Sequence, residues 1–197
     1  MRVTNFFLLG IALIFAGCKD EKKVDDSAIR YRHFKLEKAG WKSKEHLQQV
    51  DDMDFTATEV PISYYILKSE GNADLFAVDS IEKANEKERV LEFIFKHDND
   101  KNLLETEFTG LNLEETVKYM SFDITNDFYL VTDKKDTINC SGVIFERNFN
   151  MVSDQKLILF FSGINPTDKI QLVYNDQLFK KGILKFKFEE KTTKLLL

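Results

Sequence analysis

The sequence predicts a mainly β protein, an antiparallel β-sandwich with few short helices. Seven or eight short runs have the alternating or continuous apolar character of strands. Strands do not alternate regularly with helices, as they would in a parallel sheet. We therefore expect two packed antiparallel sheets, and a chain of 197 residues is long enough to bury one core between them.

The strongest strand signals lie near the C-terminus, at residues 157–161, 170–174 and 183–188. Residues 157–161 are apolar without a break, so we expect them to be buried on both faces near the centre of a sheet. Residues 184–188 alternate between apolar and charged side chains, which predicts a half-buried strand with Phe186 in the core and Lys187 in water. The other predicted strands are residues 62–67, 90–96, 117–122, 128–132 and 138–145.

Turn and helix signals lie between these runs. The tetrapeptide Asn165-Pro166-Thr167-Asp168 has the composition of a β-turn. A short helix capped by Ser43 is predicted through residue 50. Asn112 and Glu115 have the spacing of a capping box, and this helix signal competes with the strand predicted at 117–122. Residues 80–89 fit either a helix or a long loop.

The first seventeen residues have the pattern of a signal peptide. Arg2 supplies the positive charge, and an apolar run follows over residues 6–16. That run is too short to span a membrane, which takes about 20 apolar residues. Residues 1–17 are therefore expected to be removed from the mature protein.

The end of this segment resembles the lipobox of bacterial lipoproteins. Ala16 and Gly17 precede Cys18, and charged residues begin directly afterwards. Phe15 departs from the leucine that is usual in the family. The resemblance implies cleavage between Gly17 and Cys18 and lipid attachment at Cys18, with covalent diacylglycerol and acyl chains and no other cofactor. Several acyl chains on one residue give stable membrane binding.

A charged tether follows the lipidated cysteine. Seven of the eight residues at 19–26 are charged, so this stretch cannot bury itself in a core. Lys19, Asp20 and Glu21 resemble the surface-export tag of Bacteroidota lipoproteins, although an ordinary charged linker that faces the periplasm has the same composition. We expect residues 18–30 to be the tether, residues 31–197 to be a single sandwich domain, and the protein to be anchored in the cell envelope, at the outer membrane.

Composition excludes several classes of protein. The formal net charge of −5 and the pI near 5.4 argue against a nucleic-acid partner. Lipidation of Cys18 would leave Cys140 as the remaining cysteine, so the immunoglobulin-like architecture predicted here has no disulfide. Cys140 falls on the apolar face of a predicted strand, which favours an inert core thiol over a nucleophile.

The candidate metal and catalytic motifs are weak. His33, His46 and His97 lack the spacing of a zinc site and are expected at the surface. The run from Asp98 to Asn102 begins like a calcium loop but lacks the required glycine and glutamate, so a polar hairpin tip is expected. Glycoside hydrolysis needs two carboxylates that flank a pocket at a set separation, and adjacent residues in a loop such as the acidic run 51–54 seldom do, so catalysis is not expected there. The sequence predicts no metal site and no enzyme.

The aromatic residues offer a candidate binding surface. Trp41 stands in a polar segment, and Tyr64 and Tyr65 are adjacent in a predicted strand, where they would point to opposite faces. An exposed aromatic residue contacts sugars or proteins, whereas Trp41 can also fold back over the open end of the core. We expect a non-catalytic binding module for an unknown protein or glycan; the alternative is an accessory subunit of an envelope assembly that faces the periplasm, and an enzyme is the minor alternative.

Overall fold

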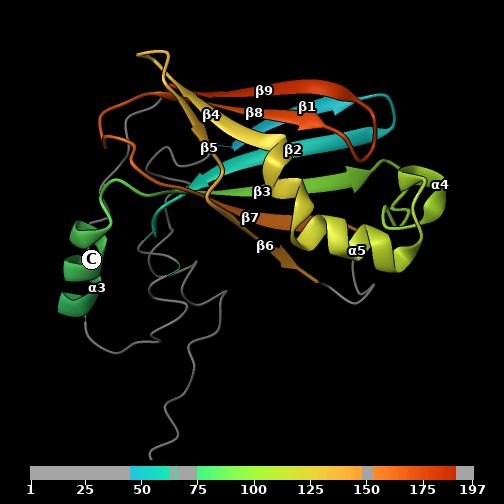
Figure 1. The fold of residues 1–197 in the computed structure, drawn as a ribbon, viewed down its shortest axis with the longest axis horizontal. Helices are drawn as coiled ribbons and strands as arrows, with labels where there is room; N and C mark the ends of the chain where they lie inside the picture. Colours follow the sequence, from blue (N-terminus) through green and yellow to red (C-terminus); the bar gives the residue numbers. More distant parts are fainter. Residues whose placement is uncertain (1–44, 63–64, 66–74, 148–152, 190–197) are drawn as a thin grey trace, which may run out of the picture.

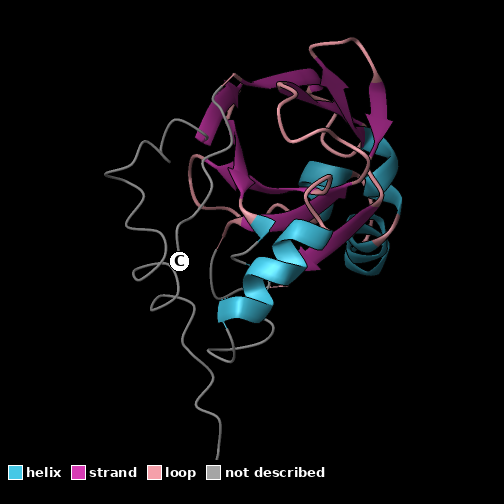
Figure 2. Cartoon of the chain, turned by 90° about the vertical axis from the view of Figure 1, so that its left-hand side faces the viewer, coloured by secondary structure: helices cyan, strands magenta, loops and turns pink. Residues whose placement is uncertain are grey.

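The computed structural model describes residues 45–62, 65, 75–147 and 153–189, and it contains two packed antiparallel sheets (Figure 1). The five-stranded sheet has the order β1-β2-β3-β7-β6, and the four-stranded sheet has the order β5-β4-β8-β9. Seen along the strands, the two sheets surround a common interior (Figure 2). The predicted β-sandwich is confirmed.

The strands of the first sheet are β1 (Glu45–Val50), β2 (Met53–Val60), β3 (Arg89–His97), β6 (Gly142–Glu146) and β7 (Gln155–Phe161). Those of the second are β4 (Phe128–Thr132), β5 (Thr137–Asn139), β8 (Ile170–Asp176) and β9 (Gly182–Phe188). The helices are α3 (Leu75–Ala84), α4 (Thr106–Thr109), α5 (Leu113–Ser121) and the 3₁₀ helix η3 (Asp123–Asp127). No helix in these described ranges is long and apolar enough to cross a membrane.

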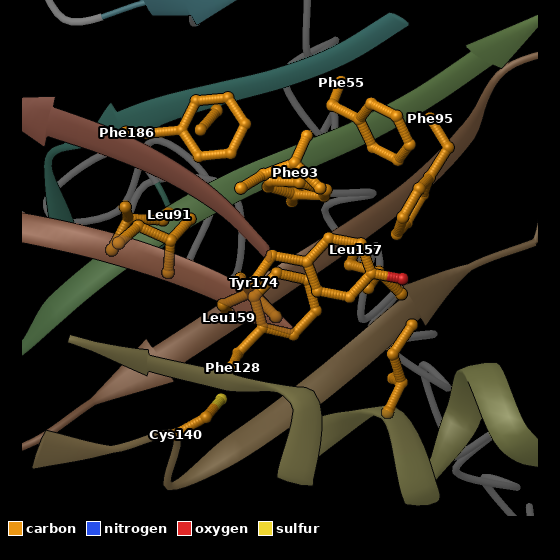
Figure 3. Packing of buried hydrophobic residues seen from close by; sticks show 14 of the residues in the cluster. Phe55, Leu91, Phe93, Phe95, Phe128, Cys140, Leu157, Leu159, Tyr174 and Phe186 are labelled. Carbon is orange, nitrogen blue, oxygen red and sulfur yellow. The ribbon is translucent and has the colours of Figure 1, made fainter. Parts of the chain in front are cut away.

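An aromatic cluster joins the two sheets (Figure 3). The ring of Phe93 on β3 lies 5.0 Å from that of Phe128, 5.3 Å from that of Tyr174 and 5.4 Å from that of Phe186, each in an edge-to-face arrangement. All four rings are fully buried. Such pairs contribute about 0.5–1.5 kcal/mol each beyond the burial of their area. Phe93 therefore links its own sheet to β4, β8 and β9 of the other sheet.

The strands predicted at 157–161, 170–174 and 183–188 are confirmed as parts of β7, β8 and β9. Leu184, Phe186 and Phe188 of β9 are buried, and the intervening Lys185 and Lys187 are exposed. In β7, residues 157–159 and Phe161 are buried, Phe160 is half-buried, and the strand lies between β3 and β6. The predicted turn is also present, because the amide of Asp168 donates to the carbonyl of Asn165 at 3.0 Å.

The helix predicted at residues 43–50 is wrong. Residues 45–50 form β1, which pairs with β2 so that Val50 lies opposite Met53 across the turn Asp51-Asp52. Asp51 has a φ of 55°, a left-handed conformation that aspartate adopts more readily than most residues. Glutamate, leucine and glutamine favour helices in isolation, and pairing with the buried strand β2 overrides that preference.

Two predicted strands are corrected. Ile62 and Tyr65 are helical, so the strand predicted at 62–67 is wrong. The strand predicted at 138–145 is divided: β5 belongs to the second sheet, β6 belongs to the first, and Cys140 lies between them. Because the chain changes sheets there, Cys140 and Ile144 do not share the apolar face of one strand: Cys140 is buried, and Ile144 is 51% exposed.

The competing signals near residue 117 resolve as a helix. The side chain of Asn112 accepts from the amide of Glu115 at 3.0 Å, and the Glu115 carboxylate accepts from the amide of Asn112 at 3.1 Å. This is the predicted capping box, and it begins α5 in place of a strand. Of the segment at 80–89, which fitted a helix or a loop, residues 80–84 end the helix α3, residues 85–88 form a turn, and Arg89 begins β3.

Candidate binding site

The two flanks of the sandwich are closed in different ways. On one flank the chain passes directly from β5 to β6, and α5 and η3 bury Thr116, Met120 and Ile124 against the core. On the other flank β1 is the edge of the first sheet and β9 is the edge of the second. We call the contact between these two edge strands the β1–β9 seam. Within the described ranges, no helix packs over it.

Side chains rather than a main-chain ladder connect β1 to β9. The Gln48 amide Nε2 donates to the carbonyl of Lys185 at 2.6 Å. Near the β1–β2 turn, Lys181 Nζ lies 2.9 Å from Asp51 Oδ2 and 3.2 Å from Asp52 Oδ1. At the opposite end, the ring of His46 stands edge-on to that of Phe188 at 4.8 Å. The seam is therefore held at three points along its length.

The main chain of β9 faces the seam at alternate residues. In an antiparallel pair, residues that exchange both hydrogen bonds with one neighbour alternate with residues whose groups point the other way. The amide of Asp133 donates to the carbonyl of Lys169, and these two residues continue the register of β4 and β8. The odd-numbered residues of β8 therefore bond to β4, and the main-chain groups of its even-numbered residues point toward β9. Their partners on β9 are Leu184, Phe186 and Phe188. The N–H and C=O groups of Ile183, Lys185 and Lys187 consequently point away from β8, as the Gln48 bond to Lys185 also indicates.

The open edge of β1 follows from the same reasoning. The amide of Asp98 donates to the carbonyl of Asp52, and these two residues continue the register of β2 and β3. The even-numbered residues of β2 therefore bond to β3, and the main-chain groups of its odd-numbered residues point toward β1. Those residues pair with His46, Gln48 and Val50. The main-chain groups of Glu45, Leu47 and Gln49 therefore point away from β2. Two rows of edge groups belong to the seam.

A groove lies along the seam. It has a volume of about 600 Å³, and it is broad and open to solvent. Leu47, 61% exposed, is its most exposed large apolar residue, and Ile183 of β9 is equally exposed. The groove is lined by His46, Leu47, Gln48, Gln171, Lys185, Phe186, Lys187 and Glu189.

The charges at the seam differ in how they are neutralised. The hydrogen bond from Lys181 lowers the pKa of Asp52, and the hydrogen bond to Asp51 raises the pKa of Lys181. Lys181 and Asp52 therefore hold each other in their charged forms. Neither Lys185 nor Lys187 is in an ion pair with a described residue. Among the described residues that line the groove, two exposed ammonium groups therefore stand against one carboxylate, that of Glu189.

His97 is buried, which corrects the expectation of a surface histidine. Its side chain is 3% exposed, its Nδ1 accepts from the amide of Asn99 at 3.0 Å, and its Nε2 lies 3.1 Å from Asp52 Oδ2. An Nδ1 that accepts leaves the proton on Nε2, from which it can be donated to Asp52. His97 thus fixes the β1–β2 turn against the end of β3. His46 is half-buried in the seam, and His33 lies outside the described residues.

The acidic motifs of the sequence have structural roles. Asp51 and Asp52 form the β1–β2 turn, and Asp98 to Asp100 form the turn that follows β3, where Asp100 bonds to Ser153. That turn leads to α4, so it is not the expected hairpin tip. In the part of the chain that the structure describes, no group of three His, Cys, Asp or Glu residues could hold a metal ion.

Two buried carboxylates lie on tyrosine hydroxyls beside the core. Tyr119 donates to Asp127 at 2.7 Å, and Tyr174 donates to Asp176 at 2.7 Å. Burial raises the pKa of Asp127, and Asp176 nearby adds to that increase. Burial also raises the pKa of both tyrosines. Asp176 further accepts from the amides of Leu178, Phe179 and Lys181, so it organises the loop that leads into β9.

Cys140 is buried at 9% exposure, as expected from the sequence. Its thiol donates to the carbonyls of Gly142 at 3.1 Å and Phe160 at 3.5 Å. Burial raises the pKa of the thiol, which disfavours the thiolate that nucleophilic chemistry needs.

The predicted binding aromatics do not form a surface among the described residues. The hydroxyl of Tyr65 donates to Glu92 at 2.9 Å, and its helical backbone removes the argument that it points away from Tyr64. Trp41 and Tyr64 lie outside the described residues, as do Gly17, Cys18, Lys19, Asp20 and Glu21. The seam itself was missed because its two strands are far apart in the chain, and alternation in β9 was the one signal that pointed to it.

The chain has little similarity to known proteins. No family model matches the chain, and no curated protein matches it. A crystal structure of a DUF4426 family protein from Pseudomonas aeruginosa is similar over 74% of this chain and 91% of its own, with 9% sequence identity and a TM-score of 0.36. The fold therefore rests on the sheet order and register described above.

Proposed function

We propose that the protein is a lipid-anchored, non-catalytic binding module of the cell envelope, and that a protein partner docks at the β1–β9 seam. The observation that carries this proposal is the pair of open strand edges, with the exposed side chains of Leu47 and Ile183 beside them. Unpaired strand edges and exposed apolar groups are sites of association.

A protein partner is favoured over a glycan by the chemistry of the groove. Among the described residues that line the groove, the phenylalanine is Phe186, and its ring is 1% exposed, so its face is not offered to a sugar. Main-chain N–H and C=O groups bind best to another main chain. The seam therefore fits a polypeptide.

The anchor in this proposal is Cys18. The order of charge, apolar core, small residues, cysteine and charged tether supports it. Acyl chains on Cys18 would hold the protein at the outer membrane, and the tether would let the sandwich face either the cell surface or the periplasm. In the full-length protein, Cys18→Ala should abolish labelling by a clickable fatty acid and release the protein from the membrane fraction. Undiminished labelling of the variant would refute the anchor.

A second candidate is an accessory subunit of an envelope assembly that faces the periplasm. Leu113 is 56% exposed and Phe122 is 70% exposed, at the two ends of α5 on the flank opposite the seam. A subunit inside an assembly needs contacts on more than one side, and these residues offer a second apolar contact.

In-cell cross-linking separates the two candidates. A photoreactive amino acid replaces Leu47 in the seam or Leu113 on α5. The binding-module proposal expects a protein adduct from position 47 and none from position 113. Adducts from both positions favour the accessory subunit, and an adduct from position 113 alone would overturn the seam as the docking site.

A further inference from the structure

We infer that the partner docks as an extended, acidic segment that adds a strand to the free edge of β9. This inference rests on the proposed function and specifies how the partner binds. It concerns one strand, β9, and the side chains that alternate along it.

The edge of β9 has the groups that strand addition requires. The N–H and C=O groups of Ile183, Lys185 and Lys187 point toward the seam, in a strand without proline or a break in its pairing to β8. Among the described residues, the Gln48 amide is the one group found on this edge, and it bonds to the carbonyl of Lys185 alone. An extended peptide could satisfy the remaining groups with its own main chain.

The side chains of the edge select the charge of the added strand. Ile183, Lys185 and Lys187 are exposed on the outer face of β9. Side chains directly opposite each other on one face of an antiparallel pair interact, and like charges there are unfavourable. A second copy of β9 would place lysine near lysine. Glutamate or aspartate at alternate positions of a partner would instead pair with Lys185 and Lys187.

The other face of the added strand would meet a different surface. Leu184, Phe186 and Phe188 point inward from β9, and Phe188 is capped by the ring of His46. Residues of the partner that alternate with the acidic ones would therefore face an apolar side of the seam. The expected segment has acidic and apolar residues in turn.

A synthetic peptide tests this pattern. The probe is an octapeptide of alternating glutamate and valine, blocked at both ends and titrated into the full-length protein in detergent. The matched peptide has lysine in place of glutamate. We expect the glutamate peptide to bind and the lysine peptide to bind at least about 10-fold more weakly, because repulsion between lysines replaces attraction between glutamate and lysine on one face. Equal binding of both would overturn the acidic selection.

Hydrogen exchange distinguishes strand addition from simple charge attraction. With saturating glutamate peptide, the amides of Ile183, Lys185 and Lys187 should exchange at least about 10-fold more slowly, because they gain hydrogen bonds. The amides of Leu184, Phe186 and Phe188 should change little, since β8 already holds them. Binding without new protection at the odd-numbered residues would overturn strand addition.

Variants locate the site and separate the two proposals. Lys185→Glu combined with Lys187→Glu should weaken binding of the glutamate peptide at least about 10-fold. The control combines Lys83→Glu with Lys118→Glu, which changes the net charge by the same amount at exposed residues of α3 and α5, away from β9. Equal loss in both pairs would contradict binding at β9. If the peptide fails while position 47 still cross-links to a partner in cells, strand addition is wrong and the proposed function stands.

Discussion

Tyr174 donates its hydroxyl to Asp176, two residues ahead on β8, across 2.7 Å in the buried interior. The same carboxylate oxygen accepts from the amides of Leu178 and Phe179. A strand residue thus links the aromatic core to the loop that positions β9. The ring of Tyr174 also stacks on Phe128 at 4.5 Å. The shape of the seam depends on this loop.

Tyr174→Phe should destabilise the protein by about 1–3 kcal/mol, because the variant keeps the ring and removes a donor from a buried carboxylate. The control is Tyr129→Phe on the neighbouring strand β4, where the hydroxyl has no hydrogen bond to a described residue. It should stay within about 0.5 kcal/mol of the native protein. Urea unfolding measures both, and equal losses would show that the Tyr174 bond contributes nothing specific.

The two faces of β9 predict opposite outcomes for adjacent substitutions. Phe186→Ala removes a ring that is 1% exposed and contacts Phe93, so we expect a loss of about 3–5 kcal/mol. Lys187→Ala on the exposed face should change stability by less than about 0.5 kcal/mol. Denaturation midpoints compare the two. A larger loss from Lys187→Ala would mean that the register of β9 is shifted by one residue.

The part of the fold that the sequence predicted is the part that local pattern determines. Alternation in β9 and the capping box at Asn112 act over a few residues, and both are confirmed. The local pattern of residues 45–50 predicts a helix, whereas their strand conformation comes from pairing with β2. The alternation of residues 138–145 predicts one strand, and nothing in it marks the change of sheet at Cys140.

The seam could not be predicted for the same physical reason. Gln48 and Lys185 are 137 residues apart in the chain, and the sheet order alone brings their strands together. The burial of His97 likewise depends on Asp52, 45 residues away. The sequence offers exposed lysines on β9 without showing which strand lies beside them.

Asp127 makes stability depend on pH. Burial raises its pKa in the folded state above the unfolded value, so the folded protein binds this proton more tightly. The contribution of the protonated form is complete below the unfolded pKa and is lost as pH rises through the folded pKa. Asp127→Asn should therefore gain stability relative to the native protein as pH rises from about 3 to 7. Thermal unfolding over that range measures the difference.

The exposed Glu86→Gln serves as the control for loss of one negative charge. Asp127→Asn keeps an oxygen that can accept from Tyr119, so its effect reports mainly on charge. If the gain in stability of Asp127→Asn over the native protein stays constant with pH, or shrinks as pH rises, burial of an ionised Asp127 is not the source of that gain.

Cys140 should be unreactive in the folded protein. In a Cys18→Ala background it is the remaining thiol, and burial with a raised pKa keeps it protonated and out of contact with reagent. Modification by a disulfide reagent should require denaturant. Reaction of the native protein at the rate of free cysteine would show that the β5–β6 connection opens readily.

Amide hydrogen exchange of the full-length protein without any partner measures whether β9 has a free edge toward the seam. We predict slow exchange at Leu184, Phe186 and Phe188, whose amides bond to β8, and exchange at least about 10-fold faster at Ile183, Lys185 and Lys187. Equally slow exchange at all six residues would mean that another strand already covers this edge, and the seam would not be a site where a partner can add one.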